Sequence, residues 1–554
     1  MAYMKRLLSF FFLFITVVWV NAQMPFGLPP KREVRAVWLT TIGGLDWPHS
    51  YARTSQGIEK QKKELEEILD NLQESNINTV LMQVRIRATT AFPSSMEPWD
   101  GAFSGIPGRS PGYNPLAFAI SECHKRGMEL HAWVVVIPAG KWNGIGARTL
   151  RANGLPVKRI GNDAFLDPER PISASYIGTF CKQIARDYDV DGIHLDYIRY
   201  PEQWRLRVSH EQARANITRI VRTVYREVKA VKPWIKVSCA PIGKYSDLSR
   251  YSSYGWNAYT KGNQPAQQWL EEGIMDQVYP MMYFQGNQFY PFAADWQENS
   301  FGRTVVPGLG AYFLDPSLGS WQLGDITRQL YVLRQLNMGH AYFRSSFFTH
   351  NVKGLRLYAN DFVDAYPALT PALTWQSTEP PHSPAWTEKP HEVNGNRIMM
   401  SWKGTTPYYN IYVSCSSPVD IADVRNLVAV RYTRNELILP DKGQPIYVAV
   451  TGMDRYGNES KALQSMDYVP LQEGPTVPLL LCKADELKVP QCVSEGDFKY
   501  FQLRNVVGGV VRSYIKPSKG YISLAYVPYG AYWLYGLSKK GWHRLGVFYY
   551  KKTL

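Results

Sequence analysis

The sequence has few cysteines and none of the residue spacings that hold common cofactors. Six cysteines in 554 residues are too few for a disulfide scaffold, and no two of them form a C-x-x-C pair. The sequence also lacks the H-E-x-x-H and H-x-H spacings of metal sites and a glycine-rich dinucleotide fingerprint. We therefore expect a protein with no resident metal and no organic cofactor.

No apolar run in the sequence is long enough to cross a membrane as a helix. The most apolar run follows Lys5 and Arg6 and extends over the 14 residues Leu7–Val20, whereas a spanning helix needs about 20. The small residues that end at Ala22 are typical of a signal-peptidase site. We expect residues 1–22 to be a signal peptide and the rest to be exported to the periplasm, the cell surface or the extracellular space. An uncleaved anchor is the alternative.

Acidic residues are fewer than basic ones: the sequence has 47 Asp and Glu residues and 62 Lys and Arg residues, which gives a net charge of +15. This excess predicts an anionic partner, but the basic residues form no concentrated stripe and no zinc-finger spacing is present, which argues against nucleic acid. The 17 Trp and 36 Tyr residues are more than a core needs and fit surfaces that stack on sugar rings.

From Glu33 to about Phe362, apolar strand-like segments alternate with amphipathic helical segments, which is typical of a parallel sheet. Eight strand–helix pairs favour a (β/α)8 TIM barrel over residues 31–365 rather than an open sheet. The expected strands are Val34–Thr41, Thr79–Arg85, Met128–Ile137, Gly192–Ile198, Ile235–Ala240, Gln277–Tyr283, Thr304–Gly310 and His340–Arg344.

The composition changes after the expected barrel. Residues 366–390 are rich in proline and are predicted to be a linker. Short β-branched and aromatic strands then fill residues 391–470, a pattern that resembles a fibronectin type III β-sandwich with Trp402 in its core. Residues 471–554 are again strand-like and predict a small C-terminal β-rich domain of unknown role.

The fourth expected strand carries the strongest candidate for chemistry. In Asp191–Pro201, alternation places Ile193 and Leu195 on one face and His194 and Asp196 on the other. Active sites of α/β barrels lie at the carboxyl ends of the strands, so Asp196 is expected at the catalytic rim with His194 one layer beneath it. Burying a carboxylate in such a place costs several kcal/mol of folding free energy unless the carboxylate is paired. Such an Asp is more often functional than structural, so we favour a catalytic role for Asp196.

Neighbouring strands supply further candidates for substrate binding. His131 and Trp133 share one face of the third strand. Arg85 and Arg87 end the second strand and Arg199 follows the fourth, so together they are candidates to hold a carboxylate-bearing ligand. The alternative is that these arginines pair with acids of the barrel itself.

Several segments at the expected strands and their ends carry a family resemblance. They are Arg35–Thr40 (RAVWLT), Asn78–Arg85 (NTVLMQVR), Pro111–Pro115 (PGYNP), His124–Gly127 with His131–Trp133, Asp191–Pro201 (DGIHLDYIRYP), Pro241–Gly243 and Gln277–Pro280. Through these segments, over about Lys31–Phe362, the sequence resembles the glycosyl-hydrolase-like 10 family. This resemblance implies a barrel enzyme acting on glycans, with peptide-free peptidoglycan strands the substrate of some members. Members often have a second acid directly after the position of Asp196, where this sequence has Tyr197.

The fourth strand is also similar to the DGxDxDxE strand of family 18 chitinases, and the segment ending in Tyr283 is similar to their M-x-Y. The matching positions are Asp191, His194, Asp196 and Ile198, so the chitinase acid falls on an isoleucine. This likeness implies that Asp196 steadies the N-acetyl group of the substrate, that Tyr283 contacts the substrate, and that the proton donor is not assigned.

Glycosidases ordinarily use two carboxyl groups. Asp46 is the favoured second catalytic acid, since it lies in a strand-to-helix loop next to Trp47, which is a candidate for stacking on a sugar. A turn residue is the alternative for Asp46. Asp167 and Glu202 are further candidates.

The sequence thus predicts a secreted glycoside hydrolase. We expect it to cleave a polysaccharide that contains N-acetylhexosamine, with peptide-free peptidoglycan strands as the first substrate. A non-catalytic glycan-binding protein of the cell envelope is the alternative, because only one acid is well placed. The expected partner is a polysaccharide, without nucleic acid and without a membrane span; linkage and oligomeric state are left open.

Overall fold

The computed structural model describes residues 29–554 apart from 250, 252, 254, 394–396, 415–417, 441–446, 466–479, 484, 490–497, 499, 507–508, 526, 539–540 and 552–554. The expected signal peptide, residues 1–22, lies outside the described residues. Within the part of the chain that is described, no helix has the length and apolar character needed to span a membrane.

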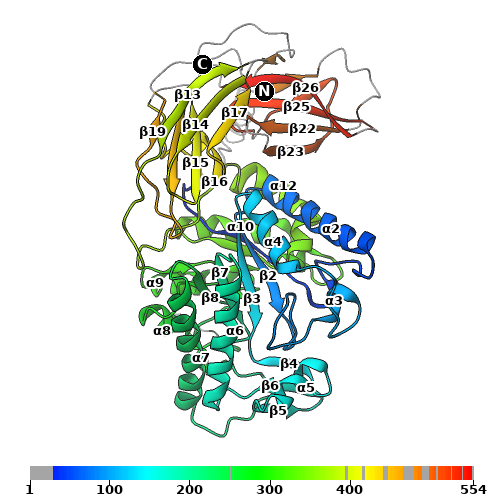
Figure 1. Ribbon diagram of the computed structural model, residues 1–554, viewed down its shortest axis with the longest axis vertical. Coiled ribbons are helices and arrows are strands. Elements are labelled where there is room, and N and C mark those ends of the chain that lie inside the picture. Colours follow the sequence, from blue (N-terminus) through cyan, green and yellow to red (C-terminus); the bar gives the residue numbers. More distant parts are fainter. Residues whose placement is uncertain are drawn as a thin grey trace, which may run out of the picture.

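Residues 35–342 contain the strands of a closed parallel barrel (Figure 1). Nine strands run parallel in the order β10-β9-β8-β7-β3-β2-β1-β12-β11. Only Val306 and Pro307 separate β10 from β11. The strands at the two ends of the sheet are therefore two parts of one barrel strand, and the sheet closes into a barrel of eight strands. The expected (β/α)8 barrel is therefore confirmed. The strands are β1 Arg35–Leu39, β2 Thr79–Arg85, β3 Glu129–Val135, β7 Gly192–Asp196, β8 Lys236–Cys239, β9 Gln277–Val278, β10 Thr304–Val305, β11 Gly308–Leu309 and β12 His340–Tyr342.

Helices surround the barrel because each presents an apolar stripe to the outer face of the sheet. In α2, Leu65, Leu69 and Leu72 are buried at helical spacing, and the Thr54 side chain caps the helix by accepting from the Gly57 N–H. The main helices are α2 Ser55–Glu74, α3 Gly101–Ser104, α4 Pro115–Lys125, α6 Pro171–Asp187, α7 His210–Val231, α8 Ala266–Glu271, α9 Tyr290–Glu298, α10 Leu323–Gln335, α11 Ser345–Thr349 and α12 Leu355–Tyr358.

Alternation along the strands divides outer from inner residues. Ile193 and Leu195 of β7 pack in the large core shared with the helices. His194 lies in the barrel interior, where it contacts Trp38 and Tyr279. The interior is therefore partly polar, as the alternation of β7 predicts.

The barrel carries one insertion with its own small sheet. Between β3 and α6 the chain forms β4 Pro138–Lys141, α5 Ile145–Ala152, β5 Val157–Ile160 and β6 Asp163–Leu166, paired in the order β4-β6-β5. This rim insert lies beyond the carboxyl ends of the barrel strands, at the lower end of Figure 1. We call the carboxyl ends of the barrel strands, with their loops, the catalytic rim.

From Ala385 onward the described chain forms antiparallel sheets. Two of them, in the orders β13-β14-β17 and β16-β15-β18-β19, enclose a core that contains Trp402 and Tyr409 and together make a sandwich. Trp402 is only 2% exposed. The strands are β13 Ala385–Val393, which begins inside the segment predicted to be a linker, β14 Arg397–Lys403, β15 Tyr408–Ser414, β16 Leu427–Tyr432, β17 Glu436–Pro440, β18 Tyr447–Met453 and β19 Leu463–Gln464.

The last described sheets have a separate core around Leu487, Phe501 and Phe548. Both they and the sandwich lie at the amino-terminal end of the barrel strands, opposite the catalytic rim (Figure 1). The likeness of the sandwich to a fibronectin type III domain stays a prediction. The strands of the last sheets are β20 Cys482–Lys483, β21 Glu486–Lys488, β22 Tyr500–Asn505, β23 Val510–Ile515, β24 Tyr521–Ser523, β25 Gly530–Ser538 and β26 Gly541–Tyr550.

Candidate active site

Asp196 ends β7 on the catalytic rim and is partly exposed there. Its Oδ2 accepts a hydrogen bond from Trp133 Nε1 at 3.0 Å, and its Oδ1 accepts one from the Tyr197 N–H at 2.6 Å. Burial raises the pKa of Asp196, and these two hydrogen bonds act in the opposite direction. The carboxyl group is thus held in one orientation by donors from β3 and β7, while solvent still reaches it.

The backbone after Asp196 is strained. Tyr197 adopts a φ of 50°, a left-handed conformation that is unfavourable for a residue with a large side chain. The Tyr197 hydroxyl donates to Glu202 at 2.8 Å, and its ring lies 3.9 Å from the Arg199 guanidinium. Strain of this kind persists where surrounding contacts hold it and is common at functional sites.

Aromatic side chains form a wall beside Asp196. Burial, and then the neighbouring Asp196 carboxylate, raise the pKa of Tyr283 well above its usual range, so its hydroxyl remains a donor. The Tyr283 ring lies 5.7 Å from that of Tyr312 and 5.3 Å from that of Phe343. All three rings are partly exposed. The sequence pointed to Tyr283 but missed Tyr312 and Phe343, which follow β11 and β12 and become neighbours only when the barrel closes.

The layer beneath Asp196 is a closed hydrogen-bonded group around His194. Trp38 Nε1 donates to His194 Nε2 at 3.2 Å, so the other ring nitrogen, Nδ1, is the one that donates to Ser238 Oγ at 2.9 Å. Burial lowers the pKa of His194 well below its usual range, which keeps the ring neutral. With no exposed surface, His194 supports the rim but does not contact substrate, contrary to the sequence-based prediction.

His131 is also too deep for the predicted contact with substrate. Its side chain is fully buried, and its Nε2 lies 3.1 Å from Glu129 Oε2. A Cβ on Gly192 would lie 2.5 Å from His131 Nδ1, so glycine is required where β7 passes this ring. Trp133 is 4% exposed and acts on Asp196 through its N–H.

Arg85 belongs to the barrel rather than to a ligand site. Its Nε and Nη2 bind Glu97, the latter at 2.7 Å, and its Nη1 donates to the Val135 and Val136 carbonyls. Burial alone would lower its pKa, but the Glu97 carboxylate raises it. The prediction that Arg85 holds substrate is therefore wrong, because buried internal partners use its donors.

Arg199 and Arg87 differ in whether the guanidinium is already paired with an acid of the protein. Arg199 Nη2 lies 2.7 Å from Glu202 Oε1 and the residue is 6% exposed. Although burial acts to raise it, the bond from Arg199 holds the pKa of Glu202 below its usual range, so Glu202 is a poor proton donor. Arg87, in contrast, is exposed and makes no ion pair with any described residue. Of the three predicted arginines, Arg87 is the one with a guanidinium free for a ligand.

In the loop after β1, Asp46 is buried and held by internal contacts. Asp46 is 1% exposed and accepts from the Thr40 N–H at 2.8 Å, the Ser346 N–H at 3.0 Å and the Arg344 guanidinium. This arrangement supports a structural ion pair rather than the predicted acid. Trp47 is fully buried, and its Nε1 donates to the Gln61 carbonyl at 2.7 Å. The prediction that Trp47 stacks on a sugar is wrong, because no face of the ring is exposed.

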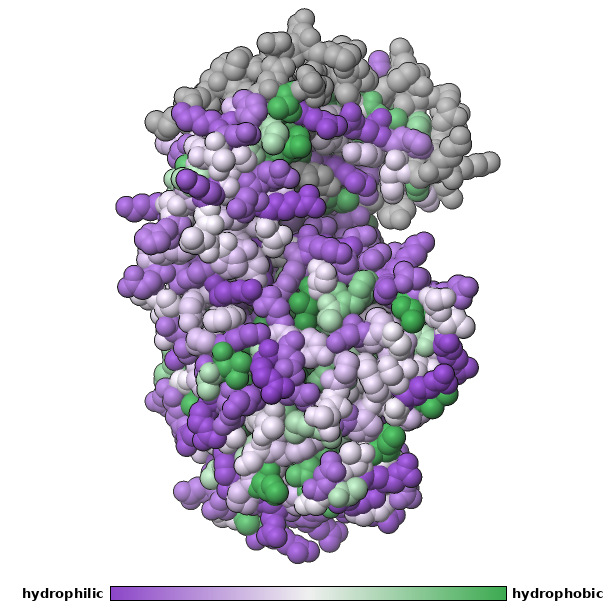
Figure 2. All heavy atoms as spheres, in the orientation of Figure 1, coloured by the Kyte–Doolittle hydropathy of each residue, from purple (hydrophilic) through white to green (hydrophobic). Residues whose placement is uncertain are grey.

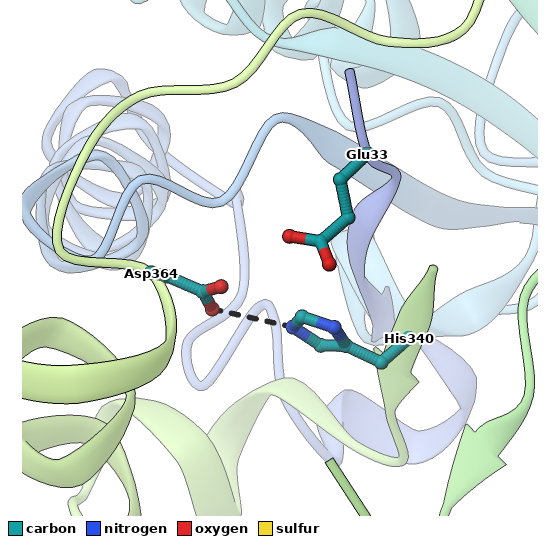
Figure 3. Close-up of side chains that lie close together, drawn as sticks. All are labelled: Glu33, His340 and Asp364. Carbon is teal, nitrogen blue, oxygen red and sulfur yellow. Dashed lines mark hydrogen bonds and ion pairs between the residues drawn. The ribbon is translucent and has the colours of Figure 1, made fainter. Parts of the chain in front are cut away.

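Figure 3 shows the one group of described residues whose spacing suits a metal ion: Glu33, His340 and Asp364, with potential ligand atoms within 4.8 Å of one another. Arg35 Nε lies 2.8 Å from Glu33 and 3.1 Å from Asp364, and Arg334 Nη2 lies 2.6 and 3.5 Å from the same carboxylates. His340 Nε2 contacts Asp364 at 3.2 Å. Two guanidiniums already balance both carboxylates, so this cluster stabilises the amino-terminal end of the barrel.

Comparisons with known proteins identify the family of the chain. The glycosyl hydrolase-like 10 family model matches residues 33–212 and 205–308. Glycosyl hydrolase YngK of Bacillus subtilis (strain 168) is 26% identical over 483 residues, which cover 78% of this chain and 92% of that protein. Glycosyl hydrolase DigH of Escherichia coli (strain K12) is 28% identical over 291 residues, which cover 46% of this chain and 66% of that protein.

Among solved structures, the PgaB (BpsB) glycoside hydrolase domain from Bordetella bronchiseptica aligns with 60% of this chain and 99% of its own, at 15% identity and a TM-score of 0.42. The matched residues of the family model extend from β1 to β10 and include Asp196 and its donor Trp133. The chain therefore belongs to the glycosyl hydrolase-like 10 family and is a glycoside hydrolase.

Proposed function

We propose that the enzyme cleaves a polysaccharide containing N-acetylhexosamine, and that peptide-free peptidoglycan strands are its substrate. The observation that carries the proposal is the pair formed by Asp196 and Tyr283 on the catalytic rim. One is a fixed, partly exposed carboxyl group, and the other is a hydroxyl donor whose pKa that carboxylate helps to raise. Such a pair offers one acceptor and one donor, which is what a 2-acetamido group requires.

In the proposed complex, Asp196 accepts the acetamide N–H and Tyr283 donates to the acetamide oxygen. This orientation presents the acetamide oxygen to the anomeric carbon. Positive charge that develops on the sugar and the acetamide in the transition state is then stabilised by the Asp196 carboxylate. That attraction is stronger in the transition state than in the bound substrate, so it lowers the barrier rather than only tightening binding.

The surroundings of Asp196 support this use of the substrate's own acetamide. Arg199 is the charged residue among the described groups that shift the pKa of Asp196, and no second acid is among them. A two-carboxylate mechanism ordinarily needs the second group within about 5–9.5 Å. Asp46 is neutralised by Arg344, and Glu202 is paired with Arg199. The acetamide therefore takes the place of a protein nucleophile in the proposal.

Family membership supports the choice of polymer, because peptide-free peptidoglycan strands are the substrate to which the family resemblance points. The apolar run at Leu7–Val20 supports action outside the cytoplasm, where such strands occur. Purified peptide-free strands, chitin oligosaccharides and neutral β-glucans should be incubated with the enzyme and with the Asp196→Asn variant. We expect new reducing ends, identified by mass spectrometry, from the acetamido polymers and from the unchanged enzyme alone. Products from neutral glucans only would refute the proposal.

A further inference from the structure

We propose that Glu202 is a positioning residue that acts on Asp196 through Tyr197. Glu202 and Arg199 hold the Tyr197 side chain, and the Tyr197 backbone in turn keeps its N–H aimed at the Asp196 carboxylate. This inference rests on the catalytic use of Asp196 in the proposed function and deepens it, because it names the residues that fix one of the two carboxylate oxygens.

Tyr197 is held in a backbone conformation that is unfavourable for it. Its φ of 50° is left-handed, which disfavours a residue with a side chain by a factor of roughly 5–30. The chain on both sides is fixed. Ile198 is buried in the core, and its carbonyl accepts from Gln264 Nε2 at 3.2 Å. The Asp196 carbonyl accepts from the Val136 N–H at 2.9 Å.

Relaxation of Tyr197 would therefore disturb Asp196. With Ile198 fixed in the core, a change of φ at Tyr197 to a negative value requires rotation of the peptide group between Asp196 and Tyr197. That peptide group carries the N–H that donates to Asp196 Oδ1 at 2.6 Å. The left-handed conformation of Tyr197 is thus a condition for the hydrogen bond that orients the carboxylate.

Two side chains from the loop after β7 hold Tyr197 in this conformation. The Tyr197 hydroxyl donates to Glu202 Oε2 at 2.8 Å, and the Arg199 guanidinium lies 3.9 Å from the centre of the Tyr197 ring. Arg199 Nη2 lies 2.7 Å from Glu202 Oε1, so the two oxygens of Glu202 connect the hydroxyl to the guanidinium. Because the direction of the Tyr197 side chain changes with φ, its contacts with Glu202 and Arg199 exist only in the left-handed conformation.

Arg199 gives this arrangement a fixed base. The residue is buried, and a Cβ on Gly262 would lie 3.6 Å from Arg199 Cδ, so the Arg199 stem packs along the loop after β8. The Tyr200 N–H donates to the Gly262 carbonyl at 3.2 Å. The surface at this lower end of the molecule is largely hydrophilic (Figure 2), where an isolated ion pair contributes little. A buried guanidinium in a fixed position loses less side-chain entropy when it pairs with a carboxylate.

The charged and titratable groups that face Asp196 within the described ranges come from three elements. Arg199 in the loop after β7 favours the charged form of Asp196. Burial, and then the Asp196 carboxylate, raise the pKa of Tyr283 after β9 and of Cys239 at the end of β8, so both are neutral near neutral pH. The Tyr197 N–H bond also favours the charged form, so loss of this bond should raise the pKa of Asp196.

The test compares Tyr197→Ala with Tyr197→Gly in the full-length enzyme, on a glycan that the unchanged enzyme cleaves. Both variants lack the ring and the hydroxyl, but only glycine adopts the left-handed conformation without strain. We expect kcat of the alanine variant to be about tenfold below that of the glycine variant, at similar KM. The midpoint of its kcat–pH profile should also be higher. Equal kcat or equal midpoints for the two variants would overturn the proposal.

Glu202→Ala separates positioning from direct action on the substrate. In the chain with Tyr197 we expect kcat to fall about fivefold, and Glu202→Gln, which retains an acceptor for the hydroxyl, should lose less. In the Tyr197→Gly background, Glu202→Ala should change kcat little, because glycine needs no side-chain contacts to stay left-handed. An equally large loss of kcat in both backgrounds would show that Glu202 acts without Tyr197 and would refute the positioning role.

Lys519 offers a matched control, since it is exposed, has a φ of 51° and lies between β23 and β24. Lys519→Ala and Lys519→Gly should have the same kcat. Thermal unfolding of every variant separates loss of fold from loss of positioning. A near-normal kcat for Asp196→Asn would contradict the proposed function. If Asp196 is required but the alanine and glycine variants of Tyr197 behave alike, the positioning role alone is wrong.

Discussion

Arg431 of the sandwich is buried in the amino-terminal end of the barrel, where its Nη2 donates to Asp191 at the start of β7. Its Nη1 lies 3.2 Å from Glu129 on β3, and Tyr408 stacks on the guanidinium at 4.2 Å. Arg431 itself has a φ of 52°. The sandwich therefore supplies one of the counter-charges at the start of the two strands that carry Trp133 and Asp196 at their other ends.

We expect Arg431→Met to destabilise the protein by about 3 kcal/mol, because it removes the guanidinium that the buried Asp191 and Glu129 carboxylates share and leaves only His124 and Lys236 to balance them. The loss is measured by urea unfolding at neutral pH. Arg431→Lys retains a charge and should lose less. Adding Asp191→Asn to Arg431→Met should restore part of the stability. A methionine variant as stable as the unchanged protein would contradict this reading of the contact.

The same cluster predicts how stability depends on pH. Although burial acts to raise their pKa values, Lys236 and Arg431 hold the pKa of Glu129, and Arg431 and His124 that of Asp191, well below the usual range. Native carboxylates with lowered pKa contribute stability above about pH 4, and this contribution is lost as the pH falls further. Unfolding free energies measured between pH 6 and pH 3 should fall more steeply for the unchanged protein than for a Glu129→Gln, Asp191→Asn variant. Equal slopes would refute this prediction.

Asp196→Asn should lower kcat by a factor on the order of 10² or more, because the amide cannot stabilise developing positive charge. Thermal stability should be unchanged or slightly higher, since burial already disfavours the charged form of Asp196. Glycan affinity should change little. His194→Ala should reduce kcat less, because His194 lies beneath the rim. A near-normal rate for the asparagine variant would contradict the assignment of Asp196.

The pH–rate profile should report the raised pKa of Asp196. As a carboxylate is required, kcat should fall as the pH decreases, with a midpoint above the value of about 3.9 typical of a free aspartate. Trp133→Phe removes a donor that favours the ionised form and should move this midpoint further upward. Activity that instead rises with acidification would identify Asp196 as the proton donor.

Asp46→Asn tests the structural reading of the loop after β1. We expect a loss of about 2–4 kcal/mol in unfolding free energy, because Arg344 loses its buried partner. Well below the melting temperature, kcat should stay within about tenfold of normal, whereas loss of a catalytic acid should cost more. A loss of kcat beyond 10² without destabilisation would restore Asp46 as the second acid.

Much of the fold follows from local patterns in the sequence. Short apolar runs with intervening amphipathic helices predict all eight barrel strands, because each strand must bury its outer face against a helix. The period of two along β7 places His194 and Asp196 inside the barrel, since successive side chains of a strand point to opposite faces. Asp196 at the carboxyl end of its strand was therefore readable from the sequence.

Tertiary structure alone decided which charged side chains are free. Asp46 meets Arg344 across 298 residues of sequence, and Arg85 meets Glu97 in a loop 12 residues later. Ion pairs of this kind depend on which loops the closed barrel brings together, and no local periodicity encodes that. Arg85 and Arg87 are the same residue type two positions apart. Only the folded structure shows that Arg85 is buried in an internal ion pair, whereas Arg87 is exposed and is a candidate to contact a ligand.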